Sequence, residues 1–127
     1  LMLSLIAVCM ITGAVSAQTV NRSIALDWTA VGDDGLVGQA AVYDIRYSTD
    51  SIALVGWTTA TQVAGEPIPQ LTGSAEAYTF IVPMVDGTKY FFALKTSDEV
   101  GNWSGLSNIV TKIFIDTTPP AVVTDLR

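Results

Sequence analysis

Four acidic side chains have the types and spacing that could do chemistry in this sequence. Asp33 and Asp34 lie in a glycine-rich stretch at 31–39, and Asp98 and Glu99 lie together in a second polar stretch. Carboxylates on flexible loops are ligands that Ca²⁺ favours, so these four are candidate calcium ligands if the fold brings both stretches together. The alternative is that aspartate beside glycine is ordinary turn chemistry and that the charged tips are solvated.

Paired carboxylates could also act as acid and base in glycoside hydrolysis, but that reaction needs a cleft that holds them at a fixed separation. The chain contains no His, the usual general base and nucleophile activator. Cys9 is the only cysteine, so neither an intrachain disulfide nor a zinc site of Cys and His can form. We therefore expect no catalytic residues, no cofactor and no metal ligands beyond the calcium candidates.

Length and charge limit the fold and the partners. A chain of 127 residues suits one domain with short ends and can bury a core without a metal or several disulfides. Acidic residues outnumber basic ones 12 to 6, for a net charge of −6. Nucleic acid and anionic membrane surfaces are therefore not expected as partners.

The first 17 residues have the composition of a secretory signal peptide. Residues 1–15 are almost wholly apolar, and Ser16-Ala17-Gln18 follows, which favours cleavage after Ala17. The basic segment that normally opens such a signal is missing. A first strand of the domain, a short membrane anchor and a lipoprotein signal at Cys9 are the alternatives, the last disfavoured by the bulky Val8. After cleavage we expect no membrane insertion and a secreted or cell-surface location.

Beyond the signal, apolar residues alternate with polar ones, which is typical of strands with one buried face. The expected inward residues are Ile24, Leu26 and Trp28 in one strand and Tyr43, Ile45 and Tyr47 in the next. The first of these strands spans 23–29 and the second 42–48, with Asp44 and Arg46 outward. A short strand at 57–63, a proline-rich crossing at 65–69 and further strands at 77–82, 89–98 and 106–115 follow.

The phase of the 77–82 strand suggests a bulge near Pro83, and Asp86-Gly87 predicts a tight turn before the strand at 89–98. No stretch beyond the signal shows a sustained helical period. Many short strands separated by Gly, Pro and Asp predict an antiparallel β-sandwich.

The residues from about 23 to 115 resemble a fibronectin type III domain of bacterial exported proteins. Six stretches carry the resemblance in order: Ser-Ile-Ala-Leu-Asp-Trp at 23–28, Gly-Asp-Asp-Gly at 32–35, Tyr-Asp-Ile-Arg-Tyr-Ser at 43–48, Gly-Glu-Pro-Ile-Pro at 65–69, Asp-Gly-Thr-Lys-Tyr-Phe-Phe-Ala-Leu-Lys at 86–95, and Asp-Glu-Val-Gly-Asn-Trp-Ser-Gly-Leu-Ser-Asn at 98–108.

The resemblance implies a seven-stranded, immunoglobulin-like sandwich with sheets A-B-E and C'-C-F-G. It makes Trp28 the core tryptophan and Tyr90 the tyrosine corner, whose hydroxyl bonds back to the preceding turn. Strand A would come from 13–20 and overlap the signal cleavage region. We expect the domain to span 18–115, with 116–127 as a linker and the start of a following repeat.

The expected function is that of a non-catalytic module, a spacer or an adhesion and protein-binding unit in a larger protein. An accessory module of a secreted hydrolase acting on polysaccharide is the alternative. Its partners would be neighbouring domains of the same chain and protein or carbohydrate ligands, with exposed Trp57, Phe91 or Trp103 available to stack on sugars. Trp103 opens a Trp-Ser-Gly-Leu-Ser stretch and is expected to pack structurally over the sheet against Lys95.

Overall fold

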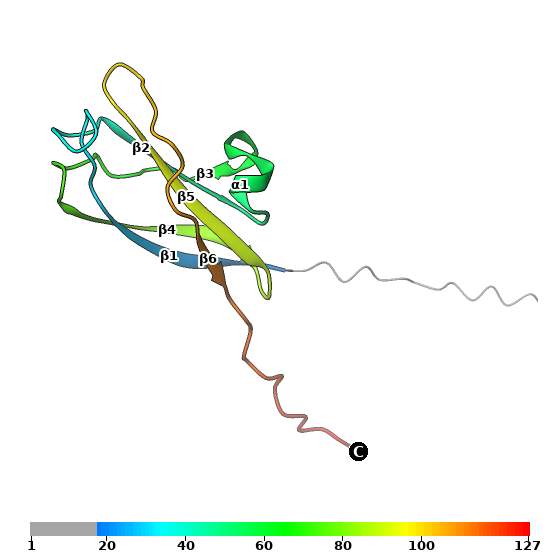
Figure 1. Ribbon diagram of the computed structural model, residues 1–127. Helices are drawn as coiled ribbons and strands as arrows, with labels where there is room; N and C mark the ends of the chain where they lie inside the picture. Colours follow the sequence, from blue (N-terminus) through cyan, green and yellow to red (C-terminus); the bar gives the residue numbers. More distant parts are fainter. Residues whose placement is uncertain (1–17) are drawn as a thin grey trace, which may run out of the picture.

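The computed structural model describes residues 18–127, whose strands form two antiparallel sheets (Figure 1). The smaller sheet pairs β1 (Thr19–Thr29) with β4 (Ala75–Val85). The larger sheet has the order β3 (Thr61–Gln62), β2 (Val42–Ser48), β5 (Lys89–Ser97) and β6 (Val110–Ile113). The two sheets pack as layers, so the predicted all-β sandwich of immunoglobulin-like type is confirmed.

The strand order agrees with the predicted arrangement, with β1 and β4 as strands B and E and β3-β2-β5-β6 as C'-C-F-G. The described residues contain six of the seven expected strands. Thr19 and Val20, placed by the sequence in strand A, instead belong to β1. The rest of that expected strand falls almost wholly in residues 1–17, which with the predicted signal lie outside the described residues.

The main core fills the space between the two sheets. It is formed mainly by the side chains on one face of β1, β2, β4 and β5. Phe92 at its centre is completely buried. Its other buried members are Ile24, Ile45, Val63, Phe80, Val82, Met84 and Tyr90. Leu26, Trp28 and Tyr47 pack against this core while remaining partly exposed, so the inward faces expected for the first two strands are correct.

The expected bulge near Pro83 is wrong. The ladder between β1 and β4 is unbroken, with Pro83 opposite Asn21. Val82 and Met84 lie two positions apart and both point into the core, so no extra residue is needed to keep the phase. Proline is tolerated there because β4 pairs only with β1 among the described strands, and the nitrogen of Pro83 lies on the open side.

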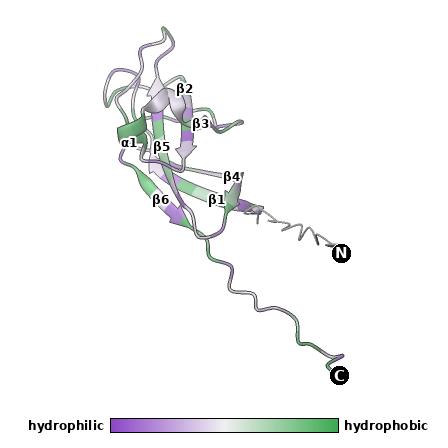
Figure 2. Cartoon of the chain, turned by 90° about the vertical axis from the view of Figure 1, so that its right-hand side faces the viewer, coloured by the Kyte–Doolittle hydropathy of each residue, from purple (hydrophilic) through white to green (hydrophobic). Residues whose placement is uncertain are grey.

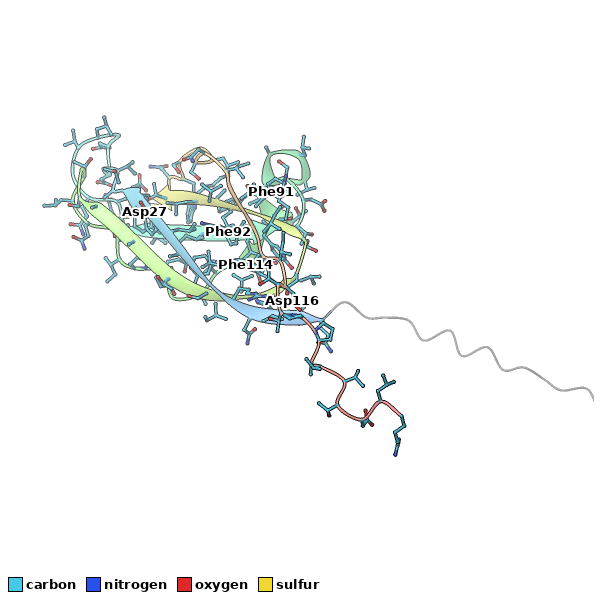
Figure 3. The ribbon with its side chains drawn as sticks, turned by 90° about the horizontal axis from the view of Figure 1, so that it is seen from below. Asp27, Phe91, Phe92, Phe114 and Asp116 are labelled. Carbon is cyan, nitrogen blue, oxygen red and sulfur yellow. The ribbon has the colours of Figure 1, made fainter. Side chains whose placement is uncertain are left out.

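The outer face of the larger sheet carries a second small core that the sequence did not predict. A four-residue helix α1 (Ile52–Val55) and a 3₁₀ helix (Trp57–Thr59) lie over it, and Ile52, Ala60 and Ala93 form its buried centre. Figure 3 shows Phe91 on the side of β5 that faces α1, while Phe92 lies toward the other sheet. Only Thr61–Gln62 of the expected strand at 57–63 pairs with β2.

This covering segment buries charges that the alternation had placed in solvent. Asp44 is only 6% exposed and forms an ion pair of 2.9 Å with Arg46. The Arg46 guanidinium lies 4.9 Å from the centre of the Trp57 ring, and the Lys95 amino group lies 5.1 Å from it. The two cations therefore hold Trp57 against the sheet through cation–π contacts.

The turn between β4 and β5 closes around Asp86-Gly87, as predicted. Gly87 has a φ of +79°, a conformation that costs a residue with a Cβ considerably more than glycine. The Tyr90 side chain is buried, and its hydroxyl oxygen accepts a hydrogen bond of 3.0 Å from the backbone N–H of Val85. The phenol thus joins the end of β4 to the start of β5.

We expect Tyr90→Phe to lower the free energy of unfolding by about 1–3 kcal/mol, because the partly buried N–H of Val85 loses its acceptor. Urea denaturation followed by circular dichroism measures this loss. Tyr47→Phe is the control, since Tyr47 packs against the same core but its hydroxyl makes no hydrogen bond within the described residues. A Tyr90→Phe protein with the midpoint of the parent would contradict this role.

Candidate functional site

The two acidic loops meet at one pole of the sandwich, as the sequence predicts. The loop after β1 contributes Gly32 and Asp33, and the loop after β5 contributes Asp98, Asn102 and Trp103. These residues line an open hollow of about 380 Å³. This hollow at the acidic pole is the candidate functional site, because it gathers the polar side chains with an aromatic ring.

Asp33 and Glu99 lie near each other at this pole. A hydrogen bond with the Glu99 carboxyl raises the pKa of Asp33, and desolvation and the negative charges of Glu99, Asp34 and Asp98 raise it further. Ionised Asp33 is therefore disfavoured by the acidic side chains around it. A negative potential is built into the loop tips.

Asp98 instead accepts hydrogen bonds from residues of its own loop. Its Oδ1 atom accepts hydrogen bonds from the backbone N–H groups of Val100 (3.0 Å) and Asn102 (2.7 Å), and its Oδ2 accepts one from the Asn102 side chain (2.6 Å). The hydrogen bond from the Asn102 backbone, joined by those from the Asn102 side chain and from Val100 and Gly101, lowers the pKa of Asp98. Asp98 thus closes the turn, the role that aspartate commonly plays beside glycine.

The calcium hypothesis for Asp33, Asp34, Asp98 and Glu99 gains no support from this geometry. Within residues 18–127, no group of three or more His, Cys, Asp or Glu side chains could hold a metal ion. Asp98 directs both carboxylate oxygens to its own loop, and Asp33 faces a second carboxyl. Turn chemistry accounts for Asp98 without a metal.

We expect Asp33→Asn to raise the melting temperature at pH 7. The raised pKa of Asp33 means that the folded state holds the proton more tightly than the unfolded state does, so ionised Asp33 opposes folding above that pKa. Asparagine removes the charge and can still donate a hydrogen bond to Glu99. The gain should shrink as the pH falls through the raised pKa and should vanish below about 3.8, where Asp33 is protonated in both states.

Thermal melts between pH 3 and pH 7 measure this difference. Asp50→Asn is the matched control, since it makes the same change of net charge at an exposed position in the turn after β2. An equal gain from both substitutions would show that net charge, and not the Asp33–Glu99 contact, sets the effect.

The expected packing of Trp103 against Lys95 is wrong. Trp103 is 51% exposed at the rim of the hollow, and Lys95 lies over Trp57 instead. The backbone of Trp103 forms an isolated β-bridge with Ser97, which places Trp103 beside the loops of the pole. Trp28, the expected core tryptophan, packs at the edge of the core with its ring centre 5.1 Å from that of Tyr43.

Sequence reasoning missed the role of two serines beside Trp103. The backbone N–H of Ser104 bonds to the carbonyl of Thr96, and the Ser104 hydroxyl accepts a bond from the Thr96 N–H. Ser107 makes the same pair of contacts with Leu94. These hydroxyl groups replace regular pairing along β5, so the expected strand at 106–115 shortens to β6. In the sequence, only the two serines three residues apart in Trp-Ser-Gly-Leu-Ser could have indicated this pairing.

The two-sheet fold and the acidic loops at one end define the class of this protein as a small all-β sandwich module. Within residues 18–127, no helix is long and apolar enough to cross a membrane.

The chain is weakly similar to animal proteins called calcium-activated chloride channel regulator 1. It is 34% identical to the Sus scrofa protein over 106 residues, which is 80% of this chain and 12% of the relative. The Equus caballus protein is 34% identical over 119 residues (88% and 13%), and the Mus musculus protein is 32% identical over 123 residues (92% and 14%). The chain spans between 12% and 14% of the length of these relatives.

Neither a protein-family model nor a solved structure matches the chain. The relatives are mammalian, so they give no support to the bacterial origin that the sequence resemblance suggested.

Proposed function

We propose that this chain is a non-catalytic module of the fibronectin type III kind, which serves as a spacer or binding unit in a larger secreted or cell-surface protein. One observation carries the proposal. The similarity covers 80–92% of this chain but only 12–14% of the relatives, so the chain corresponds to one module-sized part of much longer proteins.

The acidic pole supports the non-catalytic part of the proposal. Glycosidases hold their two carboxyl groups in a cleft on either side of the scissile bond, about 5–5.5 Å apart in retaining enzymes and about 6.5–9.5 Å apart in inverting ones. The Asp33 and Glu99 carboxyl groups lie near each other on two loop tips, and the hollow beside them is open to solvent and does not enclose a substrate. Asp98 is engaged by three donors of its own loop. The pole is thus better suited to surface recognition than to hydrolysis, which agrees equally with a binding module and with an accessory module of a secreted hydrolase.

The binding part of the proposal centres on Trp103 and the hollow beside it. An exposed indole next to Asn102 and Asp33 offers a flat apolar surface with hydrogen-bonding groups at its rim, a combination suited to a protein or carbohydrate ligand. Such a ligand would join the sandwich at its loop end and leave the core untouched.

The test is a pair of assays on the purified chain. We expect no turnover of chromogenic glycosides or esters, and saturable binding to immobilised glycans or cell-surface protein that Trp103→Ala weakens. Leu54→Ala is the control, because Leu54 is 86% exposed on α1, away from the pole. Measurable turnover that Asp33→Asn abolishes, or binding equally insensitive to both substitutions, would contradict the proposal.

The similarity favours a second candidate, in which the module belongs to a regulator of calcium-activated chloride channels. Recordings of calcium-activated chloride current in cells that carry such channels, with and without the purified chain, test it. An unchanged current would count against a direct effect of this module.

A further inference from the structure

The loops at the acidic pole expose several large apolar side chains. Leu36 and Val37, at the tip of the loop after β1, are 78% and 70% exposed, and Val100, at the tip of the loop after β5, is 74% exposed. Trp103 adds a half-exposed ring at the rim of the hollow. Apolar side chains that gather at one place on a surface mark interaction sites, whereas single ones need no explanation. The pole therefore presents an apolar surface that the core does not use.

The two loop tips lie at the same end of the sandwich. Asp33 lies near Glu99, and these residues belong to the loops that carry Leu36 and Val100. Figure 1 shows both loops at one end, with the C-terminal tail running away from them. The view at right angles shows the tail leaving in the same way (Figure 2). One partner surface can therefore contact both tips at once, and the tail does not cover them.

Backbone contacts hold both tips in place. The N–H of Gly32 bonds to the carbonyl of Gly35 and that of Asp33 to the carbonyl of Val37, each at 2.9 Å. A Cβ on Gly32 would collide with the backbone of Val37, so the loop closes tightly on itself. In the other loop, Asp98 accepts a hydrogen bond from the N–H of Val100. Loops that are already ordered lose little conformational entropy when a partner binds.

The acidic side chains around these tips have no cation to pair with among the described residues. The salt bridges in residues 18–127 are Arg22 with Asp86 and Arg46 with Asp44, neither of them at the pole. The Lys95 amino group lies over the Trp57 ring. The other basic residues of the chain are Lys89 and Lys112, which lie in the ladder at the opposite end of β5, and Arg127 in the tail. The negative charge of the pole is thus available to a positively charged partner.

We propose that the pole docks a segment of another protein in which Lys or Arg side chains stand beside aliphatic ones. Its aliphatic side chains would cover Leu36, Val37 and Val100. A basic side chain would enter the hollow lined by Asp33 and Trp103, where carboxylate charge and the face of the indole both attract a cation. This inference rests on the proposed function, because it names the class of partner for the same site.

The chemistry of the pole favours such a protein segment over a glycan. Sugar rings stack on aromatic faces, whereas Leu36, Val37 and Val100 offer aliphatic surface that is best covered by other aliphatic side chains. A neutral sugar gains no attraction from the negative charge, and an acidic glycan is repelled by it. Only a basic and aliphatic partner uses both properties of the surface.

Selection of a random-peptide library displayed on phage against the immobilised full chain tests this inference. We expect the enriched peptides to combine Lys or Arg with Leu, Ile or Val. The strongest of them, made synthetically and titrated into the ¹⁵N-labelled chain, should shift amide signals mainly in residues 31–39 and 98–104. Raising the salt from about 0.05 M to about 0.5 M should weaken its binding about tenfold, because salt screens exposed charges.

Two matched pairs of substitutions separate the apolar contact from the charge. Leu36→Ser should weaken binding of the selected peptide about tenfold or more, whereas Leu54→Ser on α1 should leave it unchanged. Asp34→Asn should weaken binding about threefold and reduce its salt dependence, whereas Asp50→Asn in the turn after β2 should do neither. All four side chains are exposed, so we expect every variant to fold like the parent.

Three results would overturn the inference. One is that no peptide is enriched or that the enriched peptides lack basic residues, and another is that the amide shifts fall outside the two loops. The third is that Leu36→Ser and Asp34→Asn bind the peptide as their controls do. Glycan binding that Trp103→Ala weakens would also overturn it but leave the proposed binding function standing. If neither the peptides nor immobilised glycans bind in a way that depends on Trp103, both proposals fail.

Discussion

Replacing Phe92 by alanine should lower the free energy of unfolding by about 3–5 kcal/mol. Its ring is completely buried between the sheets, with its centre 6.1 Å from that of Phe80 and 6.0 Å from that of Tyr47. Alanine would leave a cavity bounded by both sheets, and β2 and β5 cannot close it without breaking their ladder. Urea denaturation followed by circular dichroism gives the loss directly.

Phe91→Ala is the matched control for this experiment. It removes the same atoms one residue away, from the side of β5 that faces α1, where the ring is only partly buried. We expect a clearly smaller loss, since less apolar surface is exposed by the change. Equal losses from the two substitutions would mean that the outer cluster carries as much of the stability as the core between the sheets.

Replacing Glu76 by alanine should cost about 2–4 kcal/mol, because two donors lose one acceptor at a buried position. Glu76 is 6% exposed, and its Oε1 atom accepts hydrogen bonds from the Tyr43 hydroxyl (3.0 Å) and from the backbone N–H of Gln70 (2.6 Å). It thereby ties β4 to β2 and to the proline-rich crossing.

The Glu76→Gln variant distinguishes the effect of the hydrogen bonds from the effect of the negative charge, because it removes only the charge. Its amide oxygen can still accept from both donors, so most of the stability should remain. Burial raises the pKa of Tyr43 to about 12, and the hydrogen bond and negative charge of Glu76 act in the same direction. A Glu76→Ala protein as stable as the Glu76→Gln protein would show that neither hydrogen bond matters.

Several elements could be predicted from the sequence because their signals are local. Alternation placed Ile24 and Ile45 inward, since the side chains of a strand point to opposite faces whatever its neighbours are. Asp86-Gly87 predicted its turn because glycine readily adopts the positive φ found there. Polar stretches at 31–39 and 98–102 predicted two loops, and the strand order that the family resemblance implied placed them at one end.

Other elements could not be predicted, because they depend on what packs against them. The α1 helix has four residues, too few for a periodic signal, and its contact with β5 makes an outer face into a second core. That cover buries Asp44 and places Trp57 between two cations, while Trp103 remains free at the pole. Ser104 and Ser107 pair with β5 through hydroxyl groups that no alternation pattern describes.

The sequence by itself determined a two-layer β-sandwich, its inward faces, its tight turn and the loops that carry its acidic residues. These follow from side-chain alternation and backbone preferences, which act between residues close in the chain. Only the tertiary structure decided that Asp33 lies near Glu99 and that Glu76 on β4 accepts a hydrogen bond from Tyr43 on β2. Such contacts depend on distances between residues far apart in the sequence, which no local pattern reveals.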